Sequence, residues 1–368
     1  METAMIEWTW VALRPSIAME LVADFRAGID MGARQFRGDP KLENERRSSR
    51  DMYQKRLLFE PDDIDRAVIA ELQLDPRQSD NEIARKLGVS PNTVHRRFQL
   101  MLDQKAVSLQ AIPNVYALGY DVWVVLAMNA YAGKVDPAAL ALGSLPNIQH
   151  VIITTGRFDI FAWAVFRGLD DLLCFVNSEL GRIPQIRDIE SMISLRLAKS
   201  SWQFLTNNVK PLAAVAKRDL DPSDLALIRE VEVEPRETIT NLAAKLRMSR
   251  PSVRKRLESL LQDGSLRIEL VANPVMFGFP TRAMMLIKTS PGEVINVANS
   301  MASHERVLHV IVCAGQYDII AHGVFHDAWE MSQYVRNNLG NLRGVVRHET
   351  LMILGERKLR FSLVSAVL

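Results

Sequence analysis

The feature that most constrains this chain is an internal repeat with a fixed offset. Leu87 and Leu246 lie 159 positions apart (246 − 87), and the two halves keep this offset without a gap. Identical residues at equivalent positions include Asp65 and Asp224, Ala84 and Ala243, Ser90 and Ser249, Val94 and Val253, Gly119 and Gly278, Gly156 and Gly315, Asp159 and Asp318, and Glu190 and Glu349. One architecture, present twice, must therefore account for most of the 368 residues.

The composition excludes several classes of protein. It is 48% hydrophobic and 24% charged with a net charge of +2, which is ordinary for a globular protein. Cys174 and Cys313 are not equivalent in the repeat, which argues against a disulfide and a cysteine metal site and predicts two buried thiols. No apolar run reaches the roughly 18 residues of a membrane span, and the N-terminus lacks a secretory signal. We expect a cytoplasmic protein without membrane contact.

The first part of each repeat is predicted to be three helices. Asp62 or Asp63 can cap the first helix, Ser79 the second and Ser90 the third, whose first position is then Pro91. Apolar residues recur on one face of each helix, and the short turn at residues 88–90 separates the last two. This pattern predicts a helix-turn-helix unit.

The second part alternates in the order β-α-β-β-α-β, which is the ferredoxin-like motif. In the first repeat we expect strands near 122–131, 148–155, 158–166 and 186–197, and helices near 137–145 and 169–180. Gly156-Arg157 reads as a two-residue hairpin turn, and Gly181 and Gly340 read as left-handed helix caps.

The fold class predicted is therefore α+β, with two helix-turn-helix domains and two ferredoxin-like domains in tandem. Residues 1–60 are expected to be a flexible extension, with a basic arm at Arg46, Arg47 and Arg50 as the alternative, and the linker to drape over the surface. The predicted boundaries are 61–112 and 113–200 for the first pair of domains, 201–219 for the linker, and 220–271 and 272–368 for the second pair.

The third helix of each triplet carries the expected contacts to nucleic acid. With Val94 facing the core, helical geometry places Asn92, Arg96 and Gln99 outward, where Asn can pair with adenine and Arg with guanine. The equivalent segment of the second repeat, residues 249–256, reads SRPSVRKR and is more basic. The candidate DNA-binding residues are Ser90, Asn92, Thr93, His95, Arg96, Gln99, Arg250, Ser252, Arg254, Lys255 and Arg256. The alternative is a solvated basic face on a packing helix.

These strings resemble a known family. The pattern D-x-R-x-S-x-x-x-I-A-x-x-L-G-V-S-x-x-x-V-x-x-R from Asp75 to Arg97 is similar to the DNA-binding half of Lrp/AsnC regulators. TTGRFDIF at 154–161 and CAGQYDII at 313–320 resemble the Gly-x-Tyr/Phe-Asp signature of that family's effector domain. The resemblance implies that the chain has two winged helix-turn-helix domains and two ferredoxin-like (β-α-β-β-α-β) effector domains in tandem. It also implies that these effector, or sensor, domains pair through their sheets, with a small, often amino-acid, effector bound between them, and that the chain self-associates as a homodimer or larger assembly.

The same resemblance supplies candidate effector-binding residues: Gly156, Arg157, Asp159, Gly315, Gln316 and Asp318. The glycines and aspartates can equally be what a tight turn requires. Two departures from the family pattern stand out, because Lys105 occupies a position where Gly is usual (Gly264 in the copy) and Arg247 replaces the Gly found at Gly88. A left-handed backbone at Lys105 would cost roughly 1 kcal/mol more than at Gly.

The function predicted from these observations is a sequence-specific regulator that binds double-stranded DNA under the control of a small metabolite. No Walker loop, metal cluster or nucleophile elbow occurs, so no catalytic residue, cofactor or metal is expected, and structural roles are expected for His150 and His309. Two alternatives remain: a siroheme decarboxylase-like enzyme on the same scaffold, and a sensing or assembly protein without DNA binding. Decarboxylases of that kind carry His-Asn-Tyr before the first sensor strand, where this chain has ALGYD at 117–121.

Overall fold

The computed structural model describes residues 60–202, 204–205 and 219–359. The expectations for the N-terminal extension, and most of those for the linker, lie outside the described residues. The chain divides into two compact units, and everything below concerns the unit Phe59–Leu368. Among the described residues, no helix is both long and apolar enough to cross a bilayer.

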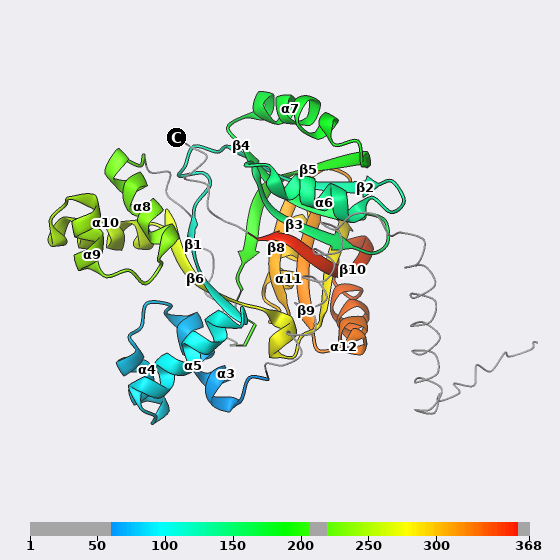
Figure 1. Ribbon diagram of the computed structural model, residues 1–368. Coiled ribbons are helices and arrows are strands. Elements are labelled where there is room, and N and C mark those ends of the chain that lie inside the picture. Colours follow the sequence, from blue (N-terminus) through cyan, green and yellow to red (C-terminus); the bar gives the residue numbers. More distant parts are fainter. Residues whose placement is uncertain (1–59, 203, 206–218, 360–368) are drawn as a thin grey trace, which may run out of the picture. The chain divides into compact units, whose positions relative to one another are not determined.

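Both helical triplets are present at the predicted offset (Figure 1). They are α3 (Asp63–Leu74), α4 (Asp80–Leu87) and α5 (Pro91–Asp103), and α8 (Pro222–Val233), α9 (Ile239–Leu246) and α10 (Arg250–Gln262). The side chains of Asp62, Ser79 and Ser90 accept hydrogen bonds from the first turns of their helices, so the three predicted caps are confirmed. Val94, Phe98 and Met101 are buried, as the apolar spacing of α5 predicts.

A single strand follows each triplet, and the sequence pattern did not predict it. These strands, β1 (Val107–Pro113) and β6 (Leu266–Ala272), pair antiparallel with each other to form a two-stranded ribbon between the repeats. Gln110 lies opposite Glu269, its own equivalent in the copy. The two repeats are therefore related by a local two-fold axis that passes through the ribbon.

Each sensor domain has the predicted ferredoxin-like order. The first contains β2 (Val122–Ala130), α6 (Val135–Ser144), β3 (Ile148–Thr154), β4 (Ile160–Phe166), α7 (Leu169–Ser178) and β5 (Ile186–Ser200). The second contains β7 (Thr281–Thr289), α11 (Val294–Ala302), β8 (Val307–Ala314), β9 (Ile319–Phe325), α12 (Ala328–Gln333) and β10 (Val345–Leu359). Short turns of other helix types are η1 (Leu180–Arg182), η2 (Pro274–Phe277) and the π-helical η3 (Tyr334–Leu339).

Three local predictions were wrong. The connection between β3 and β4 spans residues 155–159 and is not a two-residue hairpin. Gly181 lies inside a 3-10 turn, and Gly340 ends a π-helix with φ −67°, so neither is a left-handed cap. Cys174 is exposed, while Cys313 is buried as expected.

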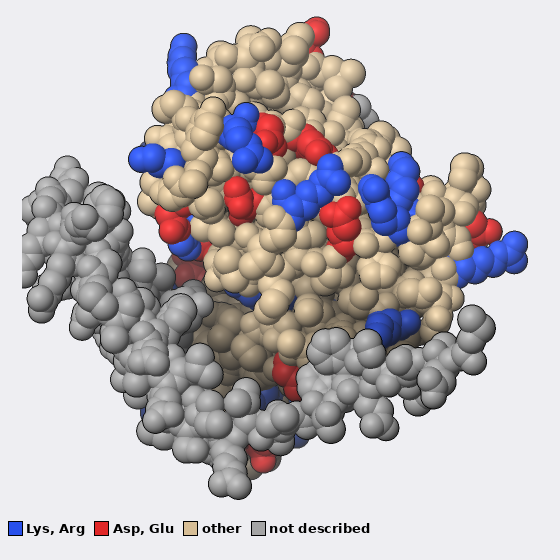
Figure 2. Space-filling view, turned by 90° about the vertical axis from the view of Figure 1, so that its right-hand side faces the viewer, with Lys and Arg blue, Asp and Glu red and all other residues tan. Residues whose placement is uncertain are grey.

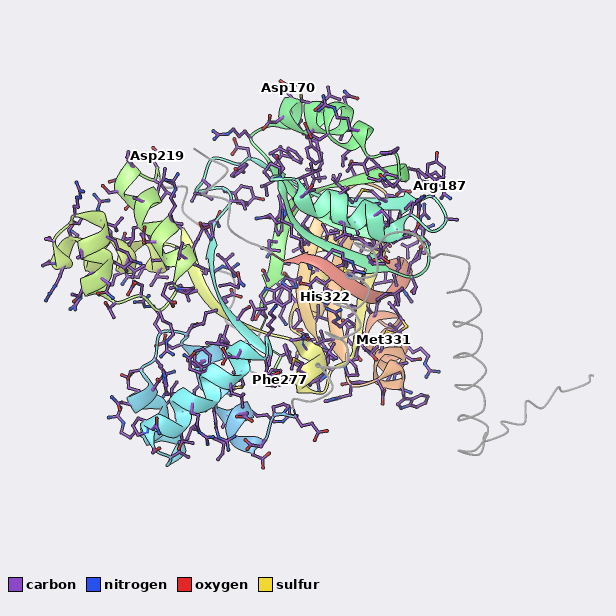
Figure 3. All side chains as sticks on the ribbon, in the orientation of Figure 1. Asp170, Arg187, Asp219, Phe277, His322 and Met331 are labelled. Atoms are coloured by element: carbon purple, nitrogen blue, oxygen red, sulfur yellow. The ribbon has the colours of Figure 1, made fainter. Side chains whose placement is uncertain are left out.

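The two sensor sheets close into one eight-stranded barrel with the order β10-β3-β4-β2-β5-β8-β9-β7. The long last strands make this closure. β5 pairs with β2 over residues 186–193 and then with β8 of the other sensor over residues 193–200. β10 does the same with β7 and then β3. The interior is lined by residues of both sensors, and His322 lies within it (Figure 3).

The helical domains are also packed against the opposite repeat. The core of the first triplet contains Leu270, Phe277 and Leu308 from the second repeat. The core of the second triplet contains Leu118, Tyr120 and Val165 from the first. Two linker residues, Trp202 and Phe204, are buried in the first of these cores, so this part of the linker does not drape over the surface as predicted.

The outer surface of the sensors has mixed charge. On the side that carries α6 and α12, Lys and Arg side chains alternate with Asp and Glu over a mostly uncharged surface (Figure 2). A surface of this kind produces no extended field of one sign, which contact with a polyanion requires. Any positive surface must therefore be sought on other faces, and the helical triplets are the candidates.

Lys105 and Arg247, the two departures from the family pattern, both have a left-handed backbone conformation. Lys105 has φ 55° and Arg247 has φ 54°, and among the described residues other than glycine these two have positive φ. Their equivalents Gly264 and Gly88 have φ 74° and 67°. Each repeat thus places a side chain where the other has Gly at the same backbone turn, at a conformational cost.

We predict that Lys105→Gly and Arg247→Gly each raise the free energy of unfolding by about 0.5–1 kcal/mol, because Gly relieves the left-handed strain. Chemical denaturation of the purified protein measures this. The matched controls are Gly264→Ala and Gly88→Ala, which introduce the same strain and should lower stability. A loss of stability in the Lys105 and Arg247 variants would contradict the prediction.

Candidate nucleic-acid interface and ligand site

The predicted reading residues of the first repeat lie on the outer face of α5. Asn92, His95, Arg96 and Gln99 are exposed and Thr93 is half-buried. Ser90 is exposed, but its hydroxyl already caps the helix by accepting from the backbone N–H of Thr93 at 3.1 Å. This face offers amide and guanidinium groups of the kind that pair with base edges in a major groove.

The second reading helix, α10, presents a more basic face. Arg250, Arg254 and Lys255 are exposed and Ser252 is half-buried. Arg250, Arg254 and Lys255 line a hollow of about 340 Å³ together with Pro251 and Glu258. Arg254 occupies the position of His95 in the first repeat. Three cations within two turns at the start of a helix suit binding to phosphate.

Arg256 does not belong to this face, and its assignment as a DNA contact is corrected here. Its guanidinium bonds Asp221 at 2.7 Å and Asp224 at 2.8 Å, at the start of α8. Arg97 does the same with Asp62 and Asp65 at 2.6 and 2.9 Å. The hydrogen bonds to Asp221 and Asp224 raise the pKa of Arg256. This arginine therefore ties the third helix of a triplet to the first.

The two helical domains hold each other by reciprocal arginine contacts. Arg77 donates to the carbonyl oxygens of Pro235 at 2.7 Å and Glu237 at 3.0 Å. Its equivalent, Arg236, donates to the carbonyl oxygen of Gln78 and to Asp80. Both loops between the first and second helices thus meet across the local two-fold axis, which fixes the two readers relative to each other.

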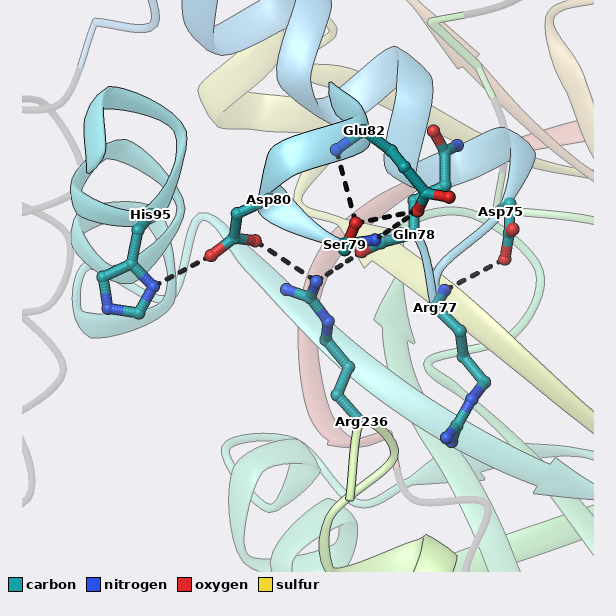
Figure 4. A network of polar contacts seen from close by, with 8 residues as sticks. All are labelled: Asp75, Arg77, Gln78, Ser79, Asp80, Glu82, His95 and Arg236. Carbon is teal, nitrogen blue, oxygen red and sulfur yellow. Dashed lines mark hydrogen bonds and ion pairs between the residues drawn. The ribbon is translucent and has the colours of Figure 1, made fainter. Parts of the chain in front are cut away.

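This contact reaches the first reading helix (Figure 4). Asp80 bonds Arg236 at 3.2 Å on one side and Nδ1 of His95 at 3.0 Å on the other. The position equivalent to Asp80 in the second repeat is Ile239, which has no carboxylate to offer Arg254. The first reader therefore has a carboxylate beside its position 95, and the second has none at the equivalent place.

The family-type turns, where effector residues were predicted, are built into the seam between the sensors. The carboxylate of Asp159 accepts from the backbone N–H of Ala130 at 3.0 Å. That of Asp318 accepts from the N–H of Thr289 at 2.8 Å and from Lys288 at 2.7 Å. These aspartates therefore brace the ends of β2 and β7.

The other predicted effector residues lie at the same seam. Gly315 has φ 158°, and a Cβ there would lie 2.9 Å from the Met192 side chain on β5. A Cβ at Gly156 would lie 3.5 Å from the Leu351 side chain of β10, which is an ordinary contact. Arg157 lies 3.2 Å from Glu190 and 3.8 Å from Glu349, one carboxylate from each sensor, and Gln316 is exposed. The geometry explains these residues as parts of an interdomain contact.

A cavity that the sequence did not predict lies inside the barrel. Its volume is about 60 Å³, and aromatic residues from both sensors and the linker line it: Trp123, His150, Trp163, Trp202, His309 and His322. Among these, only the repeat of His150 and His309 was visible in the sequence. Within the described residues, no group of three His, Cys, Asp or Glu side chains is placed to hold a metal ion.

Two histidines of the cavity, His309 and His322, are uncharged at neutral pH. Burial, with a smaller contribution from His150, lowers the pKa of His309 to about 3. Burial and the neighbouring His309 hold the pKa of His322 well below its usual value. Nε2 of His322 and Nε1 of Trp123 are buried without a hydrogen-bond partner. The cavity thus combines flat aromatic walls with unused polar atoms.

Comparison with family models places all four modules. An AsnC-type helix-turn-helix domain model matches residues 62–102, and a winged helix-turn-helix DNA-binding model matches residues 220–266. The Lrp/AsnC ligand binding domain model matches twice, at residues 127–203 and 282–363. The order of these matches is that of a tandem pair.

The regulators that are similar in sequence correspond to one repeat each. An uncharacterized HTH-type transcriptional regulator of Pyrococcus abyssi is 32% identical over 144 residues, which are 39% of this chain and 90% of that protein. Regulatory protein AsnC of Escherichia coli K12 is 31% identical over 137 residues, 37% of this chain and 90% of that protein. The crystal structure of the siroheme decarboxylase NirDL has a TM-score of 0.56 at 16% identity, covering 83% of this chain and 97% of that one. That likeness shows a shared fold.

We predict that Arg256→Gln lowers the free energy of unfolding by about 1–3 kcal/mol, because it removes the charged hydrogen bond to the buried carboxylate of Asp224. Thermal denaturation followed by circular dichroism measures the change. Arg254→Gln, on the outer face of the same helix, is the matched control and should leave stability within about 0.5 kcal/mol. If the two substitutions lower the free energy of unfolding equally, the bonds of Arg256 to α8 do not stabilise the domain.

The low pKa of His309 predicts that the protein loses stability in acid. The unfolded chain takes up a proton at His309 below pH 6.5, whereas the folded chain does so only near pH 3. The free energy of unfolding should therefore fall as the pH drops through this window, by about 1–2 kcal/mol between pH 6.5 and pH 5 from this histidine. Denaturation curves at the two pH values measure it. His309→Asn should show a smaller loss and exposed His95→Asn the full loss; identical losses would refute the assignment.

Proposed function

We propose that this chain, which belongs to the Lrp/AsnC family of transcriptional regulators, binds double-stranded DNA through α5 and α10 and responds to a small effector held by its sensor domains. The observation that carries the proposal is the pair of exposed reading helices fixed to each other by β1, β6 and the Arg77 and Arg236 contacts. Phosphates would be neutralised by Arg250, Arg254 and Lys255, and base edges met by Asn92, Arg96 and Gln99.

The local two-fold axis sets the form of the operator. Two readers related by two-fold symmetry contact an inverted repeat, and a fixed mutual position requires a fixed distance between half-sites. The half-sites should differ, because His95 is tied to Asp80 whereas its counterpart Arg254 has Ile239 in place of that carboxylate. We therefore propose an imperfect inverted repeat, with the second reader supplying more of the electrostatic affinity.

We also propose that the protein is a regulator without a catalytic role, and that it self-associates through its sensor domains. The regulators that it resembles in sequence support the first statement. The likeness to siroheme decarboxylase NirDL is one of fold, so it favours no enzyme activity here. A Soret shift with turnover on adding siroheme to the pure protein would overturn the first statement, and a monomer in sedimentation at micromolar concentration would overturn the second.

We predict that the double substitution Arg254→Ala and Lys255→Ala lowers affinity for the chain's own promoter region at least tenfold. It should also reduce the slope of log affinity against log salt by about 2, one for each lost phosphate contact. Electrophoretic mobility shifts across a salt series measure both quantities, and a protection footprint locates the site.

The matched control neutralises two exposed arginines of the sensor domains, Arg182→Ala and Arg343→Ala, with the same change in net charge. This control variant should bind the promoter DNA with the affinity of the parent and with the same slope of log affinity against log salt. If the Arg254 and Lys255 variant also binds as the parent does, or if the parent does not bind duplex DNA, the chain is a sensing or assembly protein whose readers do not contact DNA.

A further inference from the structure

The indole of Trp202 fills part of the space between the two sensors. Trp202 follows β5 directly, is 4% exposed, and borders the 60 Å³ cavity. Its ring meets that of His309 edge-on at 4.7 Å between centroids, and those of His322 and His150 lie at 6.3 and 6.4 Å. The indole of Trp202 therefore shows that the space between the histidines accommodates a flat aromatic ring.

The surrounding groups define the chemistry of that space. Trp163 stacks on His150 at 4.7 Å, and His309 lies parallel to His322 at 5.7 Å, so the walls are flat aromatic faces. The free edges are polar, since Trp123 Nε1 and His322 Nε2 are buried without partners. A ring that stacks on aromatic faces and carries both a donor and an acceptor would satisfy these atoms. The empty volume beside Trp202 accommodates only a few water molecules, so a ring needs the place of the indole.

We propose that the space between the sensors is a binding site for a small, uncharged, indole-like nitrogen heterocycle, which competes with the side chain of Trp202. The family-type turns are not part of this site, because their side chains are used in the seam described above. The site would be single and asymmetric, since Trp163 and Trp123 of the first sensor correspond to His322 and Arg282 in the second.

The main chain around Trp202 connects this site to the readers. The carbonyl oxygen of Trp202 accepts from Gln73 of α3 at 3.1 Å, and that of Ser200 accepts from Arg267 of β6 at 3.3 Å. The backbone N–H of Ser201 donates to the carbonyl oxygen of Leu308 of β8 at 3.0 Å. A ligand that moves the indole must therefore disturb contacts with the first helical domain and with the ribbon. This coupling, unlike the binding itself, rests on the proposed DNA-binding function.

Binding is tested without DNA, on the full chain, with indole and benzimidazole as probes. Trp202→Ala empties the place of the ring, so isothermal titration should give indole a dissociation constant at least tenfold lower than for the parent. The variant should also gain thermal stability on adding indole. Trp329→Ala removes an exposed tryptophan of α12 and is the matched control, which should bind as the parent does. If Trp202→Ala fails to fold, Trp202→Leu takes its place with the same expectation.

Equal affinity of the Trp202 variant, its control and the parent for both probes would overturn the site, and so would millimolar probe without any heat of binding. A second measurement separates the coupling. In the parent, saturating indole should change affinity for promoter DNA at least threefold, and Gln73→Ala should abolish that change while leaving indole binding intact. Binding of indole by a chain that does not bind duplex DNA would uphold the site and refute the proposed function.

Discussion

The structure depends on the exchange of the last strand of each sensor. β5 and β10 are fifteen residues long, about twice the length that their own sheets use. The surplus half of each strand pairs with the other sensor, and this closes the barrel. Every strand edge of both sheets is thereby satisfied, which removes the unpaired edges that a lone ferredoxin-like sheet leaves. Neither repeat can separate without breaking two strand ladders, so the two sensors form one body.

The helical domains also pack across the two repeats. Each triplet buries residues of the opposite repeat, and β1 and β6 exist as a sheet only because the two copies meet. The arginine contacts between the helical loops complete the connection on the same axis. A change of angle between the sensors must therefore reach both readers, because each helical domain packs against residues of both repeats. This is the physical basis on which a small ligand between sensors can alter DNA binding, by favouring one arrangement over another.

Much of this fold was predictable from local sequence. Residues such as Ser79, Ser90 and Pro91 act on their own helix within three positions, so their caps can be read from the chain itself. The β-α-β-β-α-β order follows from periodicity, and the offset of the repeat is kept by nearly every element. Arg256 shows where such reasoning ends: helical spacing gives the direction of a side chain, but the carboxylates of Asp221 and Asp224 that hold it lie 35 and 32 positions away.

The sequence did not reveal the proposed ligand site, for the same reason. Trp202 lies in a linker whose composition suggested surface, and its burial depends on α3, β6 and β8 meeting there. Fusion of the two repeats makes this possible, because a single covalent linker must cross from one copy to the other and so breaks the two-fold symmetry. Once symmetry is broken, equivalent positions are free to diverge, as Trp163 and His322 have done inside the barrel and His95 and Arg254 on the readers. An asymmetric sensor joined to asymmetric readers can distinguish the two halves of an operator, which two identical subunits cannot do.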